Sequence, residues 1–232
     1  FYPTNRGFDE FWGYLGGGHN YFPSEYRGAK YDKPIISNYK KPQTLTYLTD
    51  DKGDECVAFI KRHKDKAFFL YASFNAPHTP MQAVDKDLKI YAHIKDKKRR
   101  TYAAMIHRLD VNVGRIVREL KKQGIYRNTV MVFLSDNGGP TENNGAINAP
   151  FNGGKGILLE GGIRIPFVIS YPEKLKKGIY NNTITSLDLM PTFVELAGGK
   201  INKKDKLDGV NIFPYVNKEI QGLPHQTMMW RF

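Results

Sequence analysis

Residues 129–134 (TVMVFL) form an unbroken strand-like run, and residues 135–139 (SDNGG) follow it at once. A short run rich in β-branched and aromatic residues predicts a buried strand, and the polar, glycine-containing segment ends it. Upstream, apolar residues recur at steps of three and four between residues 98 and 123, which predicts one long amphipathic helix that ends at Gly124. With a further strand predicted at residues 67–74, the order strand, helix, strand is typical of an α/β sheet covered by helices.

The rest of the chain continues this pattern without internal repeats. We expect one α/β domain over residues 1–205 and a separate segment, a linker with the start of a second subdomain, over residues 206–232. The remaining predicted elements are a helix at residues 54–63, a strand at 165–171, a helix at 185–196 and the beginning of a strand at 226–232.

Composition limits the classes of partner. The formal net charge is +12, but the basic residues are spread along the chain and no nucleic-acid motif accompanies them. We therefore predict a solvated basic surface and no nucleic-acid partner, while attraction to a polyanion such as a sulfated polysaccharide stays open. No run of about 18 apolar residues occurs, so no membrane segment is predicted.

Cys56 is the only cysteine in the chain. A single cysteine excludes an intrachain disulfide and any zinc site built from several cysteines. Because the residues around Cys56 have the spacing of an amphipathic helix, we predict a buried structural thiol rather than a reactive one.

Polar side chains follow two predicted strands, where ligands of α/β sheets gather. His78 lies in residues 75–80 (NAPHTP), between prolines that stiffen the backbone. Asp136 and Asn137 follow the other strand, and a carboxylate beside an amide oxygen suits Ca²⁺ or Mg²⁺ better than zinc. Taken alone, a hydrogen-bonded structural histidine and a plain Asp-Asn-Gly turn fit these patterns as well.

Two cations lie in glycine-rich surroundings further along. Lys155 lies in residues 152–156 (NGGKG), which lack the spacing of a P-loop. Glycines let backbone N–H groups and an ammonium approach a tetrahedral oxyanion closely. Arg164 precedes the predicted strand at 165–171, and a structural ion pair with Glu160 or Asp136 is the simplest interpretation of it.

Taken together and in this order, these segments resemble the formylglycine-dependent sulfatases of the alkaline-phosphatase superfamily over essentially the whole chain. The resemblance implies an alkaline-phosphatase-like α/β fold, a mixed sheet sandwiched by helices, incomplete at its N-terminus, with the start of a small C-terminal antiparallel subdomain. The matching segments are GFDEFWG (7–13), GGHNYF (17–22), APHTP (76–80), FLSDNG (133–138), GK (154–155), EGGIRIP (160–166) and DLMPT (188–192).

The resemblance also implies roles for individual residues. Asp136 and Asn137 would be ligands of a Ca²⁺ ion, sometimes Mg²⁺, that touches a sulfate oxygen. Lys155 and His78 would bind the sulfate and help to protonate the leaving oxygen. His19 is a candidate for contact with the sugar or the sulfate, with a structural role equally open. Arg164 is a further candidate for substrate binding.

In such enzymes the nucleophile is formylglycine, a hydrated aldehyde made from a cysteine in a Cys-x-Pro-Ser-Arg or similar motif. No such motif occurs here, since Cys56 is followed by Val-Ala-Phe-Ile. We therefore expect this chain to be the C-terminal part of a sulfuric ester hydrolase that acts on a sulfated carbohydrate or an aryl sulfate. Without the nucleophile, the fragment alone is expected to be inactive.

Two other interpretations stay open at this point. One is a phosphoester or phosphonate hydrolase of the same superfamily, although none of the six histidines forms a pair with metal-ligand spacing. The other is a non-catalytic protein that binds anionic glycans. By analogy with the family we expect the periplasm or the cell exterior as the location, and the sequence indicates no oligomeric state.

Overall fold

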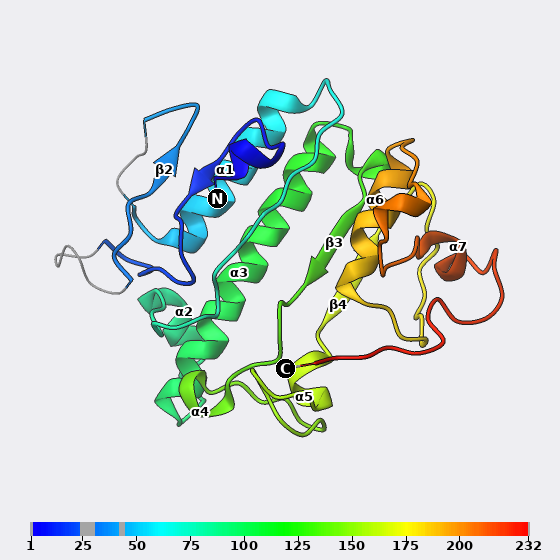
Figure 1. Ribbon diagram of the computed structural model, residues 1–232. Helices are drawn as coiled ribbons and strands as arrows, with labels where there is room; N and C mark the ends of the chain where they lie inside the picture. The colour runs from blue at the N-terminus through cyan, green and yellow to red at the C-terminus, as the bar shows by residue number, and fades with distance from the viewer. Residues whose placement is uncertain (1, 24–30, 42–44, 232) are drawn as a thin grey trace. The chain divides into compact units, whose positions relative to one another are not determined.

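The computed structural model describes residues 2–23, 31–41 and 45–231, without the side chain of Lys203. Helices account for most of the regular structure of these residues, with four short strands between them (Figure 1). Among these residues, no helix is long and apolar enough to cross a membrane.

The chain divides into two compact units. The first unit consists of Phe1–Thr129 and Leu134–Phe167, and the second consists of Val130–Phe133 and Val168–Phe232. The predicted boundary between residues 205 and 206 lies inside the second unit and stays a prediction. All six predicted site residues belong to the first unit.

Two long helices of the first unit, α1 (Leu48–His63) and α3 (Lys97–Lys122), pack side by side (Figure 1). Helix α3 confirms the helix predicted from the apolar spacing. The carboxylate of Asp96 accepts the N–H of Arg99 at 2.6 Å and so caps its N-terminus. Helix α1 begins six residues before the predicted start at residue 54, because the apolar pattern alone did not include its first polar turn.

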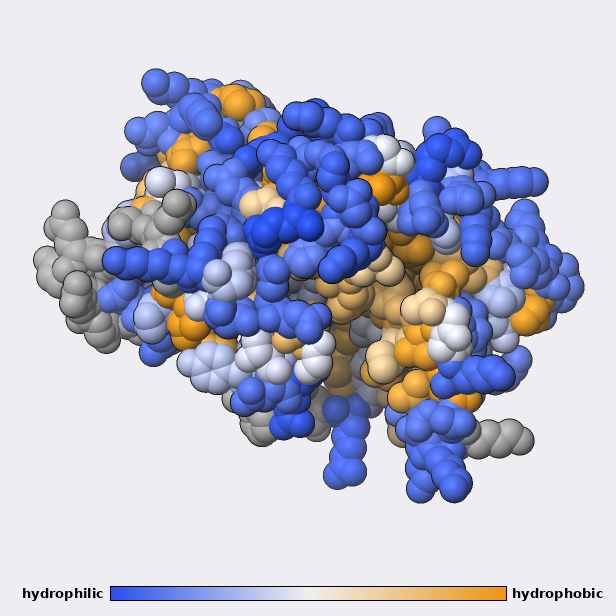
Figure 2. Space-filling model, turned by 90° about the horizontal axis from the view of Figure 1, so that it is seen from above, coloured by the Kyte–Doolittle hydropathy of each residue, from blue (hydrophilic) through white to orange (hydrophobic). Residues whose placement is uncertain are grey.

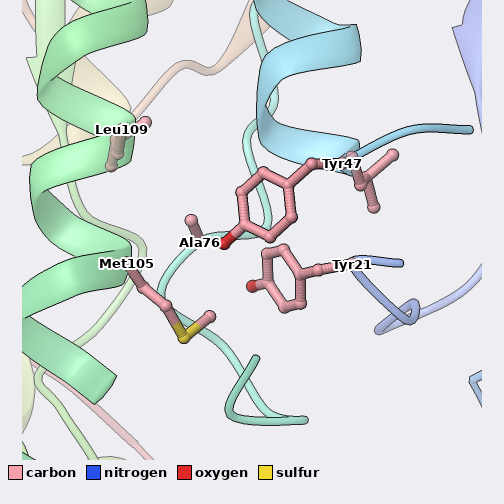
Figure 3. Close-up of a cluster of buried hydrophobic side chains, with 6 residues drawn as sticks. Tyr21, Tyr47, Ala76, Met105 and Leu109 are labelled. Carbon is pink, nitrogen blue, oxygen red and sulfur yellow. The ribbon is translucent and has the colours of Figure 1, made fainter. Parts of the chain in front are cut away.

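A cluster of buried side chains holds four segments of the first unit together (Figure 3). The rings of Tyr21 and Tyr47 stack with their centroids 5.7 Å apart. They pack with α3 and with the segment around Ala76, so the loop that contains Tyr21 and the loop that contains His78 share one core. The members of the cluster are Tyr21, Tyr47, Leu48, Ala76, Met105 and Leu109.

Helix α2 (Asp85–Ile90) is fastened to α3 by a buried ion pair. The guanidinium of Arg108 donates to both carboxylate oxygens of Asp87, from Nε at 2.7 Å and from Nη2 at 2.6 Å. Both side chains are almost fully buried. Bidentate geometry of this kind offsets the cost of removing the two charges from water.

Strand pairing among the described residues gives two small sheets. Strands β1 (Trp12–Gly13) and β2 (Ile36–Ser37) are antiparallel, with Trp12 opposite Ser37. Strands β3 (Met131–Leu134) and β4 (Phe167–Ser170) form the other sheet and confirm the strands predicted at these positions. The predicted burial of residues 129–134 is wrong, because none of these side chains is buried and Phe133 is 43% exposed.

Two predicted strands are wrong in this structure. Residues 67–74 form no helix or strand, and most of their side chains are exposed, with Tyr71 at 71%. Residues 226–231 likewise carry no strand. An apolar run predicts a strand only where a neighbouring strand satisfies its backbone groups, and the described residues provide none at either place.

In the second unit, helix α6 (Leu189–Leu196) confirms the helix predicted at residues 185–196. The buried carboxylate of Asp188 organises its start, because it accepts the N–H groups of Thr185 and Val210 at 2.8 Å and contacts the His225 ring at 2.8 Å.

The remaining elements of the described chain are α4 (Thr141–Asn144), α5 (Glu160–Ile163), α7 (Phe213–Val216) and short 3-10 helices at Pro3–Arg6, Tyr126–Asn128, Ser186–Asp188 and Lys203–Asp205.

Large hydrophobic side chains also reach the surface. On the face shown in Figure 2, hydrophobic residues gather between areas of hydrophilic ones. Over the whole described chain the exposed members include Phe69, Tyr71, Val168, Ile179 and Met229. The exposure of Phe69, Tyr71 and Met229 agrees with the absence of pairing along residues 67–74 and 226–231.

We expect Asp87→Ala to lower the free energy of unfolding by about 3 kcal/mol, because Arg108 would remain buried without its partner. The measurement is urea denaturation of the complete protein that contains this chain. Glu160→Ala is the control, since it removes the exposed partner of Arg164 and should change stability by less than about 0.5 kcal/mol. Equal effects of the two substitutions would contradict the role of the buried pair.

Cys56 lies buried in α1, as predicted. Burial raises the pKa of its thiol to about 11, so the reactive thiolate is scarce near neutral pH. We expect a maleimide to label Cys56 at least about tenfold more slowly in the folded protein than in urea. Similar labelling rates in both states would show that the thiol is accessible.

Candidate active site

Asp136 and Asn137 follow β3 after one residue, Ser135, and a local turn holds them. The Asp136 carboxylate accepts the N–H of Asn137 at 2.9 Å through Oδ1. The Asn137 amide donates through Nδ2 to the carbonyl oxygen of Gly138 at 2.9 Å. Within the described part of the chain, Asp136 Oδ2 and Asn137 Oδ1 therefore have no hydrogen-bond partner.

Free oxygens of a carboxylate and an amide fit Ca²⁺ or Mg²⁺, which take oxygen ligands. Asp136 is exposed and Asn137 is half-buried. Nowhere in residues 2–23, 31–41 and 45–231 do three His, Cys, Asp or Glu side chains gather into a metal site. The two residues fit a cation as part of its ligand set, with further ligands from elsewhere.

Lys155 is exposed and lies on the wall of an open cavity of about 690 Å³. The cavity is formed by the glycine- and asparagine-rich loop between residues 140 and 157. The backbone around the lysine takes positive φ angles, +85° at Gly153 and +82° at Gly156. Glycine adopts this region without strain, so the loop can turn on both sides of Lys155.

Backbone contacts join the segments that carry these residues. The N–H of Gly138 donates to the carbonyl oxygen of Gly162 at 2.9 Å, and the N–H of Gly161 donates to the carbonyl oxygen of Asn152 at 2.7 Å. A Cβ on Gly138 would lie 1.7 Å from the carbonyl oxygen of Gly161, so no side chain fits there. The turn after β3, the Lys155 loop and the start of α5 thus pack through glycine.

Arg164 forms the ion pair predicted with Glu160, at 3.2 Å between Nη1 and Oε1. Its guanidinium also lies 4.5 Å from the centroid of the Phe151 ring. Both charged side chains are exposed, which limits the pair to a small effect on stability. The structural pairing is therefore present, and a contact of Arg164 with substrate stays a prediction.

His78 is half-buried and leaves one ring nitrogen free. Nδ1 lies 2.7 Å from the carbonyl oxygen of Thr79, which makes Nδ1 the donor. Nε2 has no hydrogen-bond partner among the residues that the structure describes. A ring held through one nitrogen and open at the other is the arrangement that proton transfer needs.

Two tyrosine hydroxyls hold the loop that contains His78. The Tyr21 hydroxyl lies 2.9 Å from the carbonyl oxygens of both Asn75 and His78, and the Tyr47 hydroxyl donates to the carbonyl oxygen of Gln82 at 2.9 Å. Burial raises the pKa of Tyr21, and it raises that of Tyr47 to about 12. Both hydroxyls therefore stay protonated near neutral pH and keep donating.

His19 lies next to this loop but is engaged differently. A Cβ on Gly18 would lie 3.5 Å from Cε1 of His78, so the two histidine-bearing loops are in contact. His19 is only 3% exposed, with Nδ1 2.6 Å from the carbonyl oxygen of Asn20 and Nε2 2.7 Å from that of Lys33. Both ring nitrogens face backbone carbonyls, which favours the structural role over substrate contact.

The predicted residues thus come together in two groups: His19 with His78, and Asp136 and Asn137 with the Lys155 loop and the segment before Arg164. Sequence reasoning missed Asn148, whose side chain bonds to the backbone beside both Asn137 and Lys155. An asparagine within a polar loop carries no periodic signal that would have singled it out.

Known proteins share this sequence and fold. A sequence model described as Sulfatase matches residues 1–199. The chain is 33% identical to the uncharacterized sulfatase YdeN of Escherichia coli (strain K12), over 98% of this chain and 40% of that protein. It is also 33% identical to arylsulfatase J of Mus musculus, over 94% of this chain and 38% of that protein. The crystal structure of Ps i-CgsB in complex with k-i-k-neocarrahexaose matches at 42% identity and a TM-score of 0.90, over 97% of this chain and 52% of that one.

The chain spans about two fifths of the length of these curated relatives and about half of that solved structure. Structural neighbours of sulfatase type confirm the alkaline-phosphatase-like fold. These relatives do not favour the phosphoester alternative. Since the family match includes every predicted site residue from His19 to Arg164, the chain belongs to the sulfatase family.

Proposed function

We propose that the protein containing this chain is a sulfuric ester hydrolase that releases sulfate from a sulfated carbohydrate or an aryl sulfate. One observation carries the proposal. The free oxygens of Asp136 and Asn137 and the ammonium of Lys155 stand on segments that are hydrogen-bonded to a common framework, within the residues matched to the family. A divalent cation held by these oxygens, together with the Lys155 ammonium, would supply the positive charge that a tetrahedral anion requires.

Cleavage of a sulfate ester shifts negative charge onto the sulfate oxygens and the leaving oxygen. The Lys155 ammonium would bind sulfate oxygens and stabilise this charge. The free Nε2 of His78, when protonated, would donate its proton to the leaving oxygen. The Thr79 carbonyl, bound to Nδ1, keeps the ring oriented for that transfer.

Asp136 Oδ2 and Asn137 Oδ1 would hold Ca²⁺ or Mg²⁺. When bound, such a cation supplies positive charge at a sulfate oxygen. The nucleophile would be formylglycine from a part of the protein outside these residues, because Cys56 is buried in α1 and lacks the surrounding motif. We accordingly expect the 232-residue chain alone to be inactive.

The substrate class rests on two supports. The net charge of +12 suits an anionic polysaccharide, and Ps i-CgsB, at 42% identity, was solved with k-i-k-neocarrahexaose. A sulfated carbohydrate is therefore the substrate we propose first, with an aryl sulfate as the convenient assay compound. We place the protein in the periplasm or outside the cell, as the family resemblance implies.

We expect Lys155→Ala and His78→Ala each to lower kcat/KM by about 100- to 1,000-fold, the loss typical of removing a group that stabilises a transition state. The measurement is sulfate release by the complete protein from a chromogenic aryl sulfate and from sulfated oligosaccharides. Lys177→Ala and His93→Ala, both at exposed positions, serve as matched controls and should retain full activity.

Full activity of the Lys155 or His78 variants would contradict their assignment. If the complete protein carries the modification motif but releases no sulfate, the hydrolase proposal is wrong. Binding of a sulfated oligosaccharide without turnover would then favour the non-catalytic glycan-binding protein.

We also expect removal of divalent cations with EDTA to abolish sulfate release and Ca²⁺ to restore it. Asp136→Ala should weaken Ca²⁺ binding by about 10- to 100-fold in isothermal titration calorimetry, because it removes an anionic ligand. Asp65→Ala, at an exposed carboxylate in the turn after α1, is the control. Unchanged Ca²⁺ affinity in the Asp136 variant would rule out this residue as a ligand.

A further inference from the structure

The side chain of Asn148 is bound to the backbone of two other segments. Its Oδ1 accepts the N–H of Gly139 at 3.0 Å, and its Nδ2 donates to the carbonyl oxygens of Gly139 at 2.9 Å and of Gly153 at 3.0 Å. The amide thus uses both donor hydrogens and one acceptor position. A half-buried side chain that satisfies three backbone groups fixes the distance between their segments.

Those two segments carry the residues of the proposed site. Gly139 follows Asn137 by two residues, and Gly153 precedes Lys155 by two residues. The segments also meet next to Asn148, since a Cβ on Gly154 would lie 2.6 Å from the carbonyl oxygen of Gly139 and 3.1 Å from Asn148 Nδ2. Asn148 therefore occupies the junction between the cation-binding turn and the lysine loop.

We propose that Asn148 is a positioning residue that sets the Lys155 loop against the turn of Asp136 and Asn137. This inference rests on the proposed function, because it concerns the relative placement of its charged groups. Lys155 is exposed and stands between glycines, which allow the backbone a wide range of conformations. The loop therefore needs a contact that fixes its position. Small misplacement of charged groups is costly in an active site.

The chemistry of the side chain explains why asparagine stands here. Aspartate has the same shape but, when ionised, only accepts hydrogen bonds, so it would face the carbonyl oxygens of Gly139 and Gly153 without a donor. Alanine and serine are too short to span both segments. Only a side chain with two donor hydrogens and an acceptor on one short planar group meets all three backbone partners.

The test is a double-mutant cycle between Asn148 and Lys155 in the complete protein. We expect Asn148→Ala to lower kcat for an aryl sulfate by about 10- to 100-fold with little change in KM, as for residues that hold ligands in place. In the Lys155→Ala background the same substitution should cost less than about threefold, because the group it positions is gone. Asn181→Ala, at an exposed asparagine of the second unit, is the control.

A second measurement does not depend on turnover. Hydrogen exchange should become about tenfold faster at the Gly139 amide and in residues 153–156 of Asn148→Ala, while α1 stays unchanged. Asn148→Ser provides a milder variant for both measurements should the alanine variant lose its fold.

Equal losses of kcat in both backgrounds, or unchanged exchange in the lysine loop, would overturn the positioning role and leave the sulfatase proposal intact. A failed sulfatase proposal looks different, since the unsubstituted protein would then release no sulfate. Positioning by Asn148 requires both the faster exchange and the non-additive loss of kcat.

Discussion

Close packing of three glycine-containing segments is the constraint on which the candidate site depends. At Gly138 a Cβ would overlap the carbonyl oxygen of Gly161, and at Gly154 it would press against that of Gly139. Backbones can approach this closely only where side chains are absent. Because the segments touch through their backbones, the oxygens of the turn after β3 and the ammonium of Lys155 come from one framework although they are distant in sequence.

The loop that contains His78 is held by tyrosine side chains instead of by glycine packing. Buried tyrosine rings stack in the core, while their hydroxyls reach the carbonyl groups of the loop. Each ring contributes apolar burial at one end and a hydrogen bond at the other, which is the usual advantage of tyrosine in a core. The residues of the proposed site thus stand on irregular segments, which are held by packing and hydrogen bonds rather than by strand pairing.

Several elements of this fold could be predicted from the sequence, but the contacts that hold the candidate site together could not. Helix α3 was predicted because its apolar spacing reports the face that is buried, and strands β3 and β4 were predicted because short apolar runs rich in β-branched residues favour strands. The strand predicted at residues 67–74 was wrong, because an apolar run does not reveal whether another strand lies beside it. Asn148 was missed for a related reason: its importance comes from partners at Gly139 and Gly153, and nothing in the local sequence indicates which backbone groups an asparagine will meet.

The two histidines show most clearly what a sequence leaves open. His19 and His78 both lie in polar loops within matching motifs, and their loops are in contact. His19 faces carbonyl oxygens with both nitrogens, so neither is left to exchange a proton with a substrate. His78 is held through Nδ1 alone, and its Nε2 remains available. Their difference lies in hydrogen bonding, because a histidine can act as an acid only through a nitrogen that the protein itself leaves free.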